Sequence, residues 1–146
     1  MIPFSIIFSI AFTFIWSGLI IGISFMEAWL KFQSPNVTIQ IGLGIGKVVF
    51  AALNKVEWTL IFLISICFFV EIPLMNSVCI TIFVLLIFLV LLQTFWLLPK
   101  LDSRADDYIT GKSVVPSKLH LYYIFMEFIK LTLLIITGIL LTKIIY

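Results

Sequence analysis

The sequence predicts an all-α fold, an integral membrane four-helix bundle, with an additional amphipathic or extended cytoplasmic helical segment before span two. Two features of the composition carry this prediction. Of the 146 residues, 63% are hydrophobic and only 11% are charged, whereas soluble domains average about 25% charged residues. A chain this short has too little interior to hide so much apolar surface. Lipid must therefore solvate much of it.

Four apolar stretches are long enough to cross a bilayer, whose hydrocarbon core needs about 20 helical residues. They form a single transmembrane domain of residues 1–146, with spans at about 3–25, 58–75, 77–98 and 119–145. The stretch 37–54 is also apolar, but it contains three glycines, and each glycine weakens a helix by about 1 kcal/mol. We expect 37–54 to form either an interfacial helix or a cytoplasmic extension of the second span.

The basic residues predict how the chain is oriented. The loop between spans one and two contains three lysines, and the loop between spans three and four contains three lysines and an arginine, whereas the opposite side has only Lys143. Short loops rich in Lys and Arg stay in the cytoplasm. We therefore expect a multi-pass protein of the cell (inner) membrane, with both long loops cytoplasmic and both termini outside.

The fourth span carries a polar stripe that needs an explanation. His120, Tyr123, Glu127 and Lys130 fall within about 80° of one another on a helix. Lys130 lies close to the bilayer midplane, where a charge costs about 3 kcal/mol, and Glu127 can pair with it at i,i+3. The pair is either a structural lock on helix register or part of a polar pathway, so this stripe is a candidate binding or pathway site.

A second candidate site lies where the helices meet the cytoplasm. In an up-down bundle these helix ends are neighbours, so polar residues near them share one depth. The residues concerned are Glu27, Glu57, Asp102, Arg104 and His120. Carboxylates with one histidine could bind a divalent metal, shuttle protons or recognise a lipid headgroup. The alternative is ordinary interfacial charge that ends each helix.

The first span has two distinct faces. Small hydroxyl residues and a tryptophan occupy one of them, which is typical of close helix packing; they are Ser5, Ser9, Thr13, Trp16, Ser17 and Ser24. Gly18 and Gly22 form a small-xxx-small pair on the other face. This pair predicts a homo-oligomer or a partner membrane subunit in addition to the lipid bilayer.

The remaining motifs do not identify a cofactor, which stays unknown, and they do not indicate nucleic-acid binding. The run Gly42–Lys47 lacks the spacing and the terminal Ser or Thr of a phosphate-binding loop. One histidine cannot supply bis-His haem ligation. The net charge of +2 is small, and the basic residues are split between two loops. The sequence names no metal and no catalytic residue.

Several short segments resemble a known family. They are Ser24-Phe25, Leu30–Pro35, Gly46–Phe50, Leu98–Arg104 and Leu119-His120. Together they are similar to a family of small bacterial four-helix membrane proteins of unknown function, which is distantly similar to the membrane domain of copper-resistance D proteins. The resemblance implies a helical bundle and a link to metal or small-molecule handling. Met26, Met75 and Met126 are scattered over both membrane sides, so no Met/His-rich copper set is present.

These features leave three functions open. The first is a channel or transporter subunit for a small solute, ion or proton, with a route along the span-four stripe. The second is a membrane-embedded metal-binding protein or enzyme with its site at the cytoplasmic face. The third is an accessory structural subunit of a membrane complex. We expect transport rather than enzymatic activity.

Overall fold

Four long helical rods make up the protein in a computed structural model, which describes residues 3–145. The first rod joins α1 (Phe4–Leu19), η1 (Ile20–Glu27), α2 (Ala28–Leu30) and η2 (Lys31–Gln33). The second is α3 (Ile39–Val70), which the short η3 (Ile72–Leu74) follows. The third joins α4 (Ser77–Leu92), η4 (Gln93–Leu97) and α5 (Leu98–Ile109), and the fourth is α6 (Leu119–Ile145).

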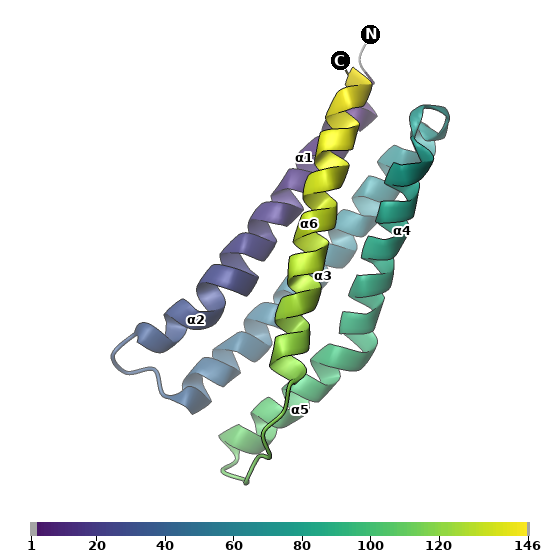
Figure 1. Ribbon diagram of the computed structural model, residues 1–146. Helices are drawn as coiled ribbons and strands as arrows, with labels where there is room; N and C mark the ends of the chain where they lie inside the picture. The colour runs from purple at the N-terminus through teal and green to yellow at the C-terminus, as the bar shows by residue number, and fades with distance from the viewer. Residues whose placement is uncertain (1–2, 146) are drawn as a thin grey trace.

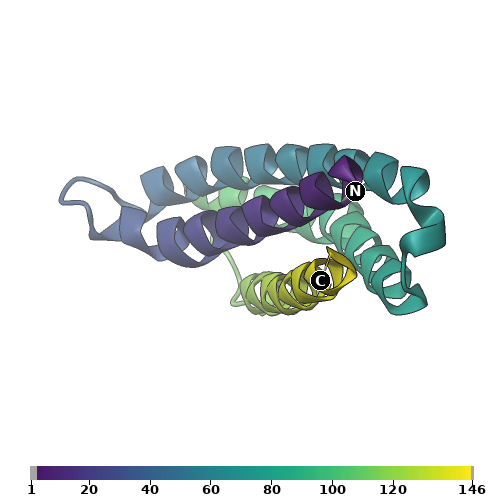
Figure 2. The ribbon, with the colours of Figure 1, turned by 90° about the horizontal axis from the view of Figure 1, so that it is seen from above.

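The rods run alternately up and down, so the two chain ends lie together at one end of the bundle (Figure 1). The turn around η3 is at that same end, and the loops 34–38 and 110–118 are at the opposite end. The first rod packs against α3 and α6, and α4 packs against α6. Seen from above, α1 lies between α3 and α6 (Figure 2).

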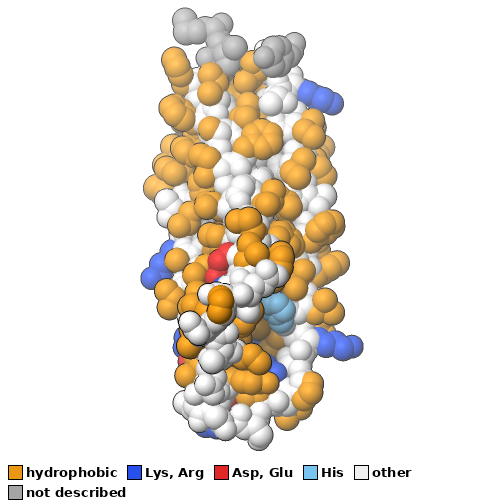
Figure 3. Space-filling model, turned by 90° about the vertical axis from the view of Figure 1, so that its left-hand side faces the viewer, with side chains coloured by type: hydrophobic (Ala, Val, Ile, Leu, Met, Phe, Trp, Pro, Cys, Tyr) orange, Lys and Arg blue, Asp and Glu red, His pale blue; other side chains and the backbone are white. Residues whose placement is uncertain are grey.

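All four rods are long and apolar enough to cross a membrane. They comprise 30, 32, 33 and 27 residues, and the most apolar 18-residue window of each has a mean hydropathy between 1.7 and 2.8. Hydrophobic side chains cover most of the surface in the view of Figure 3. The chain is therefore a multi-pass membrane protein with a four-helix bundle, as its composition predicts.

The apolar stretch 37–54 belongs to the second rod, because α3 runs without interruption from Ile39 to Val70. Its first turn is capped by the hydroxyl of Thr38, which accepts a hydrogen bond from the Ile41 N–H at 3.3 Å. Of the two alternatives for 37–54, the structure has the extension of span two. The third rod is likewise longer than the predicted span, since its helix continues to Ile109.

Two glycines of α3 let the end of the first rod approach closely. A methyl group at Gly42 would overlap the ring of Phe32, and one at Gly46 would lie 2.9 Å from the Nζ of Lys31. A larger residue at either position would force the Phe32 or Lys31 side chain to move.

The turn at the end that carries the termini is tied down by polar side chains. Here α3 ends at Val70, five residues before the predicted limit of span two. The Ser5 hydroxyl donates to Glu71 at 2.6 Å, which links the end of α3 to the start of α1. Asn76 caps α4 by accepting from the Val78 N–H at 3.0 Å.

The described structure makes a topology prediction that labelling can test. Ser77 lies at the end that carries the termini, and Ser113 lies in the exposed loop at the other end. In a protein with Cys67 and Cys79 replaced by Ala, we expect Ser77→Cys and Ser113→Cys to react with an impermeant maleimide from opposite sides of the membrane. The charge distribution predicts that Ser113→Cys reacts from the cytoplasm. Detergent permeabilisation, which should make both reactive, is the control, and reaction of both from one side would contradict the fold.

Candidate functional site

The ammonium group of Lys130 is the centre of a polar cluster inside the bundle. Its side chain is 0% exposed. The Nζ donates to the Oε1 atom of Glu57, lies 2.7 Å from Oε1 of Glu127 and donates to Oε1 of Gln93 at 2.6 Å. An ammonium has three N–H donors. Three oxygens from three different rods therefore use its full donor capacity.

Further hydrogen bonds join these partners to one another. The Gln93 amide nitrogen donates to Glu127 Oε1 at 2.7 Å, and the indole N–H of Trp16 donates to Glu57 Oε1 at 2.9 Å. On the other side of Glu127, the Ser24 hydroxyl donates to Oε2 at 3.0 Å. Both carboxylates are thus held by neutral donors as well as by the ammonium.

The cluster ends at a tyrosine on the side toward the long loops. Tyr123 OH lies 3.3 Å from the Ser24 hydroxyl oxygen, and the Tyr123 ring packs on the ring of Phe50 with centroids 4.8 Å apart. We call the complete set the Lys130 network; its members are Trp16, Ser24, Glu57, Gln93, Tyr123, Glu127 and Lys130. All seven side chains are buried, and every one of the four rods contributes at least one of them.

The Lys130 network is centred near the middle of the bundle's length. Trp16 is 12 residues beyond the start of α1, and Lys130 is 15 residues before the end of α6. At 1.5 Å per residue, these positions are about 18 and 22 Å from the bundle end that carries the termini. A hydrocarbon core is about 30 Å thick, so both positions fall within one core thickness of that end.

Two of the rods contain π-helical turns where they join the Lys130 network. Ser24 comes from η1 and Gln93 from η4. The next residue of η4, Thr94, receives hydrogen bonds from Asn54 and Trp58, each at 3.0 Å. Single π turns inside α-helices occur frequently at functional sites. Both π-helical segments, η1 and η4, thus supply polar groups to the interior of the bundle.

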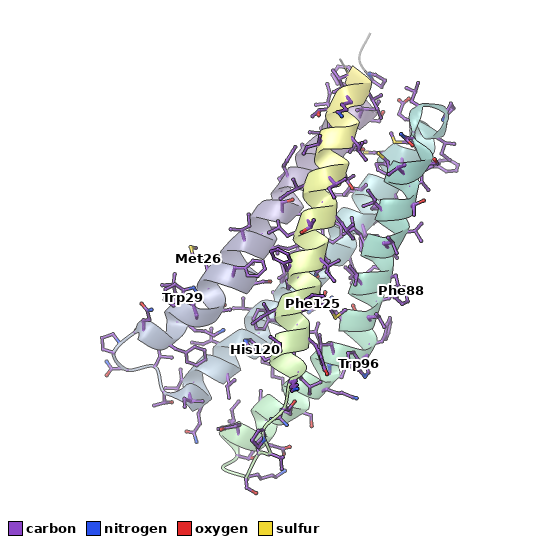
Figure 4. The ribbon with its side chains drawn as sticks, viewed as in Figure 1. Met26, Trp29, Phe88, Trp96, His120 and Phe125 are labelled. Carbon is purple, nitrogen blue, oxygen red and sulfur yellow. The ribbon has the colours of Figure 1, made fainter. Side chains whose placement is uncertain are left out.

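A hollow of about 280 Å³ lies beyond Tyr123, toward the long loops. Its apolar wall includes Leu98, Leu101 and Phe50, and the ring of Phe50 also packs on the ring of Tyr123. Its polar lining comes from Lys31, Lys47, Asp102 and His120. Figure 4 labels His120 at the loop-bearing end of α6, and the pale-blue histidine is visible at the surface in Figure 3. We call this hollow the loop-side pocket.

The structure divides the candidate residues of the sequence between these two places. Tyr123, Glu127 and Lys130 join in the Lys130 network, as the stripe on span four predicts. His120 lies one turn away and lines the loop-side pocket with Asp102.

Other expected neighbours are not brought together. Glu57 was expected at the cytoplasmic end of span two, but it is buried in the Lys130 network because α3 begins 18 residues before it. Glu27 pairs with Lys31 at 3.3 Å, and Arg104 donates to the Val115 carbonyl at 2.6 Å. The interfacial cluster expected from shared depth is therefore split.

Sequence reasoning missed Gln93 entirely. It is the only amide or charged side chain between Ser77 and Leu98, and it is 1% exposed. A lone amide in an apolar span was the available signal, since polar groups inside a membrane normally face the bundle interior. Trp16 and Ser24 were placed on a packing face, which is correct but leaves out their hydrogen bonds to Glu57 and Glu127.

Within residues 3–145, no three His, Cys, Asp or Glu side chains gather in a way that could hold a metal ion. No family model, curated protein or solved structure matches the chain. The similarity to the copper-resistance D membrane domain stays a prediction that rests on the short segments given above. The function must be argued from the Lys130 network itself.

The Lys130 network predicts a large stability difference between two variants at one position. Glu127→Leu leaves the Glu57–Lys130 pair but removes the acceptor of the buried donors Gln93 and Ser24, and each buried donor left unsatisfied costs about 1–3 kcal/mol. Glu127→Gln keeps an oxygen for Lys130 and leaves the Glu57–Lys130 pair in charge balance, so it should be much milder. Thermal unfolding in detergent measures both, with the lipid-facing Phe128→Leu (Phe128 is 60% exposed) as the control. Equal unfolding temperatures for Glu127→Leu and Phe128→Leu would contradict the proposed role of Glu127.

Proposed function

We propose that this protein binds and releases a proton inside the membrane, as a subunit of a small proton-linked transporter. The observation that carries the proposal is a charge imbalance. The Lys130 network contains two carboxylates, Glu57 and Glu127, but one ammonium, and all three are buried. With each group in its ordinary ionisation state, one negative charge is left over. In a medium of low dielectric constant, an unbalanced charge is far more costly than a balanced pair.

A proton is the cation that best restores this balance. Its addition to either carboxylate leaves one carboxylate and one ammonium, and it needs no additional space. When two carboxylates share a site, like-charge repulsion raises the affinity of the site for one proton. The site can therefore exchange a proton without exchanging any heavier atom.

The packing of the bundle also favours a proton over a larger solute. The loop-side pocket and a second hollow near Met75 lie at opposite ends of the bundle, and no member of the Lys130 network lines either one. The described side-chain nitrogen and oxygen atoms that are fully buried all have hydrogen-bond partners. The hydrogen-bonded side chains in the middle of the bundle thus suit transfer of a proton along hydrogen bonds.

Infrared spectroscopy of the purified protein in lipid tests proton binding. We expect one protonated carboxyl group at neutral pH, seen as a carbonyl stretch that shifts in D2O. Either Glu57→Gln or Glu127→Gln alone should abolish the band, because each leaves one carboxylate to balance Lys130. Lys130→Met should strengthen the band, because two carboxylates without an ammonium need two protons. Asp107→Asn, at an exposed carboxylate paired with Lys112, is the matched control.

A pH jump tests whether the bound proton moves in the membrane. Vesicles that contain the protein should give a transient current when the pH changes on one side, and Glu127→Gln should abolish it. An unchanged band in both glutamine variants, or equal currents in wild type and Glu127→Gln, would refute the proposal. The expected membrane is the cell membrane, with the loop-side pocket open to the cytoplasm.

A second candidate function is that of a subunit in a larger membrane complex or homo-oligomer. Gly18 is exposed, Gly22 is partly exposed, and nothing lies within 4 Å of a Cβ atom built at either glycine. Small residues on a lipid-facing helix let a second helix approach closely. The face of α1 and η1 that carries Gly18 and Gly22 therefore leaves room for a helix of a second subunit.

Cross-linking tests the assembly. In a background without Cys67 and Cys79, Gly18→Cys should form an intermolecular disulfide in the membrane if two copies meet at this face, and Phe62→Cys, on the lipid-facing side of α3, should not. Equal cross-linking of the two variants would indicate random collision and contradict a specific homo-oligomer at this face.

A further inference from the structure

Tyr123 is the member of the Lys130 network on the side of the loop-side pocket, and its hydroxyl makes no hydrogen bond with Lys130. It is 3% exposed. Its ring is held by Phe50 at 4.8 Å between centroids, and its oxygen lies 3.3 Å from the Ser24 oxygen. A phenol of ordinary pKa near 10 does not titrate at neutral pH. The burial of its polar end next to Glu127 needs another explanation.

The hydrogen bonds at Ser24 give this segment a direction. A serine hydroxyl has one O–H and can donate only once, and Ser24 donates to Glu127 Oε2 at 3.0 Å. While Glu127 is ionised, its oxygen can only accept, so Ser24 donates to Glu127 and Tyr123 is the donor in the contact between Ser24 and Tyr123. The order Tyr123 to Ser24 to Glu127 is a chain of donors that points from the loop side toward a carboxylate.

We infer that Tyr123 and Ser24 form the relay by which a proton from the loop-side pocket reaches Glu127, and that Phe50 is the gate between pocket and relay. The inference rests on the proposed proton binding and names the route. A hydronium ion in the pocket donates to the Tyr123 oxygen while the phenol proton passes to Ser24 and the serine proton passes to Glu127 Oε2. Water leaves the step neutral, Glu127 becomes a carboxylic acid, and both hydroxyls keep one proton each.

The packing of Phe50 supports its role as the gate. It lines the loop-side pocket together with Leu98 and Leu101, and the same three side chains pack on the small core cluster that contains Tyr123. No member of the Lys130 network lines the pocket. Water in the pocket can therefore meet the tyrosine hydroxyl only when this layer of side chains opens.

Charged groups face the relay from both sides. On the network side they are Glu57, Glu127 and Lys130; Gln93 and Trp16 are neutral. On the pocket side they are Lys31, Lys47, Asp102 and His120. Lys31 pairs with Glu27 at 3.3 Å, and Lys47 pairs with Asp106 at 2.6 Å. Both lysines thus have carboxylate partners, so the pocket does not present an unopposed positive barrier to a proton.

The rate at which the carboxyl band exchanges after transfer to D2O tests the route. Tyr123→Phe keeps the ring on Phe50 but removes the hydroxyl, so exchange should slow by about 100-fold, the scale of a lost positioned proton-transfer group. Tyr122→Phe is the matched control, since Tyr122 is 47% exposed and faces outward on the same helix. Ser24→Ala should slow exchange as Tyr123→Phe does. Phe50→Ala should speed exchange, whereas Phe62→Ala, at a lipid-facing position 64% exposed on α3, should not.

The possible outcomes separate this inference from the proposed function. If the band is present in Tyr123→Phe and Ser24→Ala and exchanges at the wild-type rate in both, the relay is wrong and proton binding stands. If wild type has no band, proton binding fails and the relay fails with it. An intact band that exchanges slowly in both relay variants and rapidly in Phe50→Ala establishes the route. The near-native band in each variant also reports that the bundle has folded.

Discussion

The ammonium of Lys130 is the constraint on which the rest of the bundle depends. Left without partners in a bilayer core, a charged side chain is costly, so the fold must bring oxygens to it from several directions. Glu57, Gln93 and Glu127 do this from α3, η4 and α6. Each rod has one rotation about its axis and one axial position at which these contacts form. A single charge therefore fixes the register of three helices, and the bond from Trp16 to Glu57 fixes the fourth.

The sequence was sufficient for the helices and for half of the site. Long apolar stretches and the i,i+3 spacing of Glu127 and Lys130 are local properties, so they can be read from a single chain. The buried position of Glu57 could not be predicted from the sequence, because it depends on where α3 begins. The glycines of 37–54 weaken the helical pattern at that point. Gly42 and Gly46 lie against Phe32 and Lys31 of the first rod, which is a tertiary contact that the local pattern does not reveal. Gln93 pairs with residues 34 and 37 positions away, and no local pattern encodes such contacts.

A buried ion pair alone would be weak evidence for function, since hydrophobic residues often stabilise a fold equally well. The Lys130 network differs from a simple lock in two respects. A lock needs one carboxylate for one ammonium, and here a second carboxylate adds repulsion that a structural role does not require. A structural ion pair also needs no further polar contacts. Here Ser24 and Tyr123 extend the hydrogen-bonded cluster toward the loop side. Excess charge and a directed extension are the two features that support the proposed proton exchange.

The two halves of the bundle are not equivalent in this respect. Toward the end with the termini, the hydroxyls of Ser9, Thr13 and Ser17 each donate to the backbone carbonyl four residues earlier. Their protons are committed within α1, so they do not form a chain of donors to Glu57. In the half toward the long loops, Tyr123, Ser24 and Glu127 are linked by hydrogen bonds in that order. A site connected to one side only cannot act as an open proton channel, and exchange with the other side requires those hydroxyls or their helix to rearrange. Within the proposed function, this asymmetry is the arrangement that a proton-linked transporter with alternating access requires.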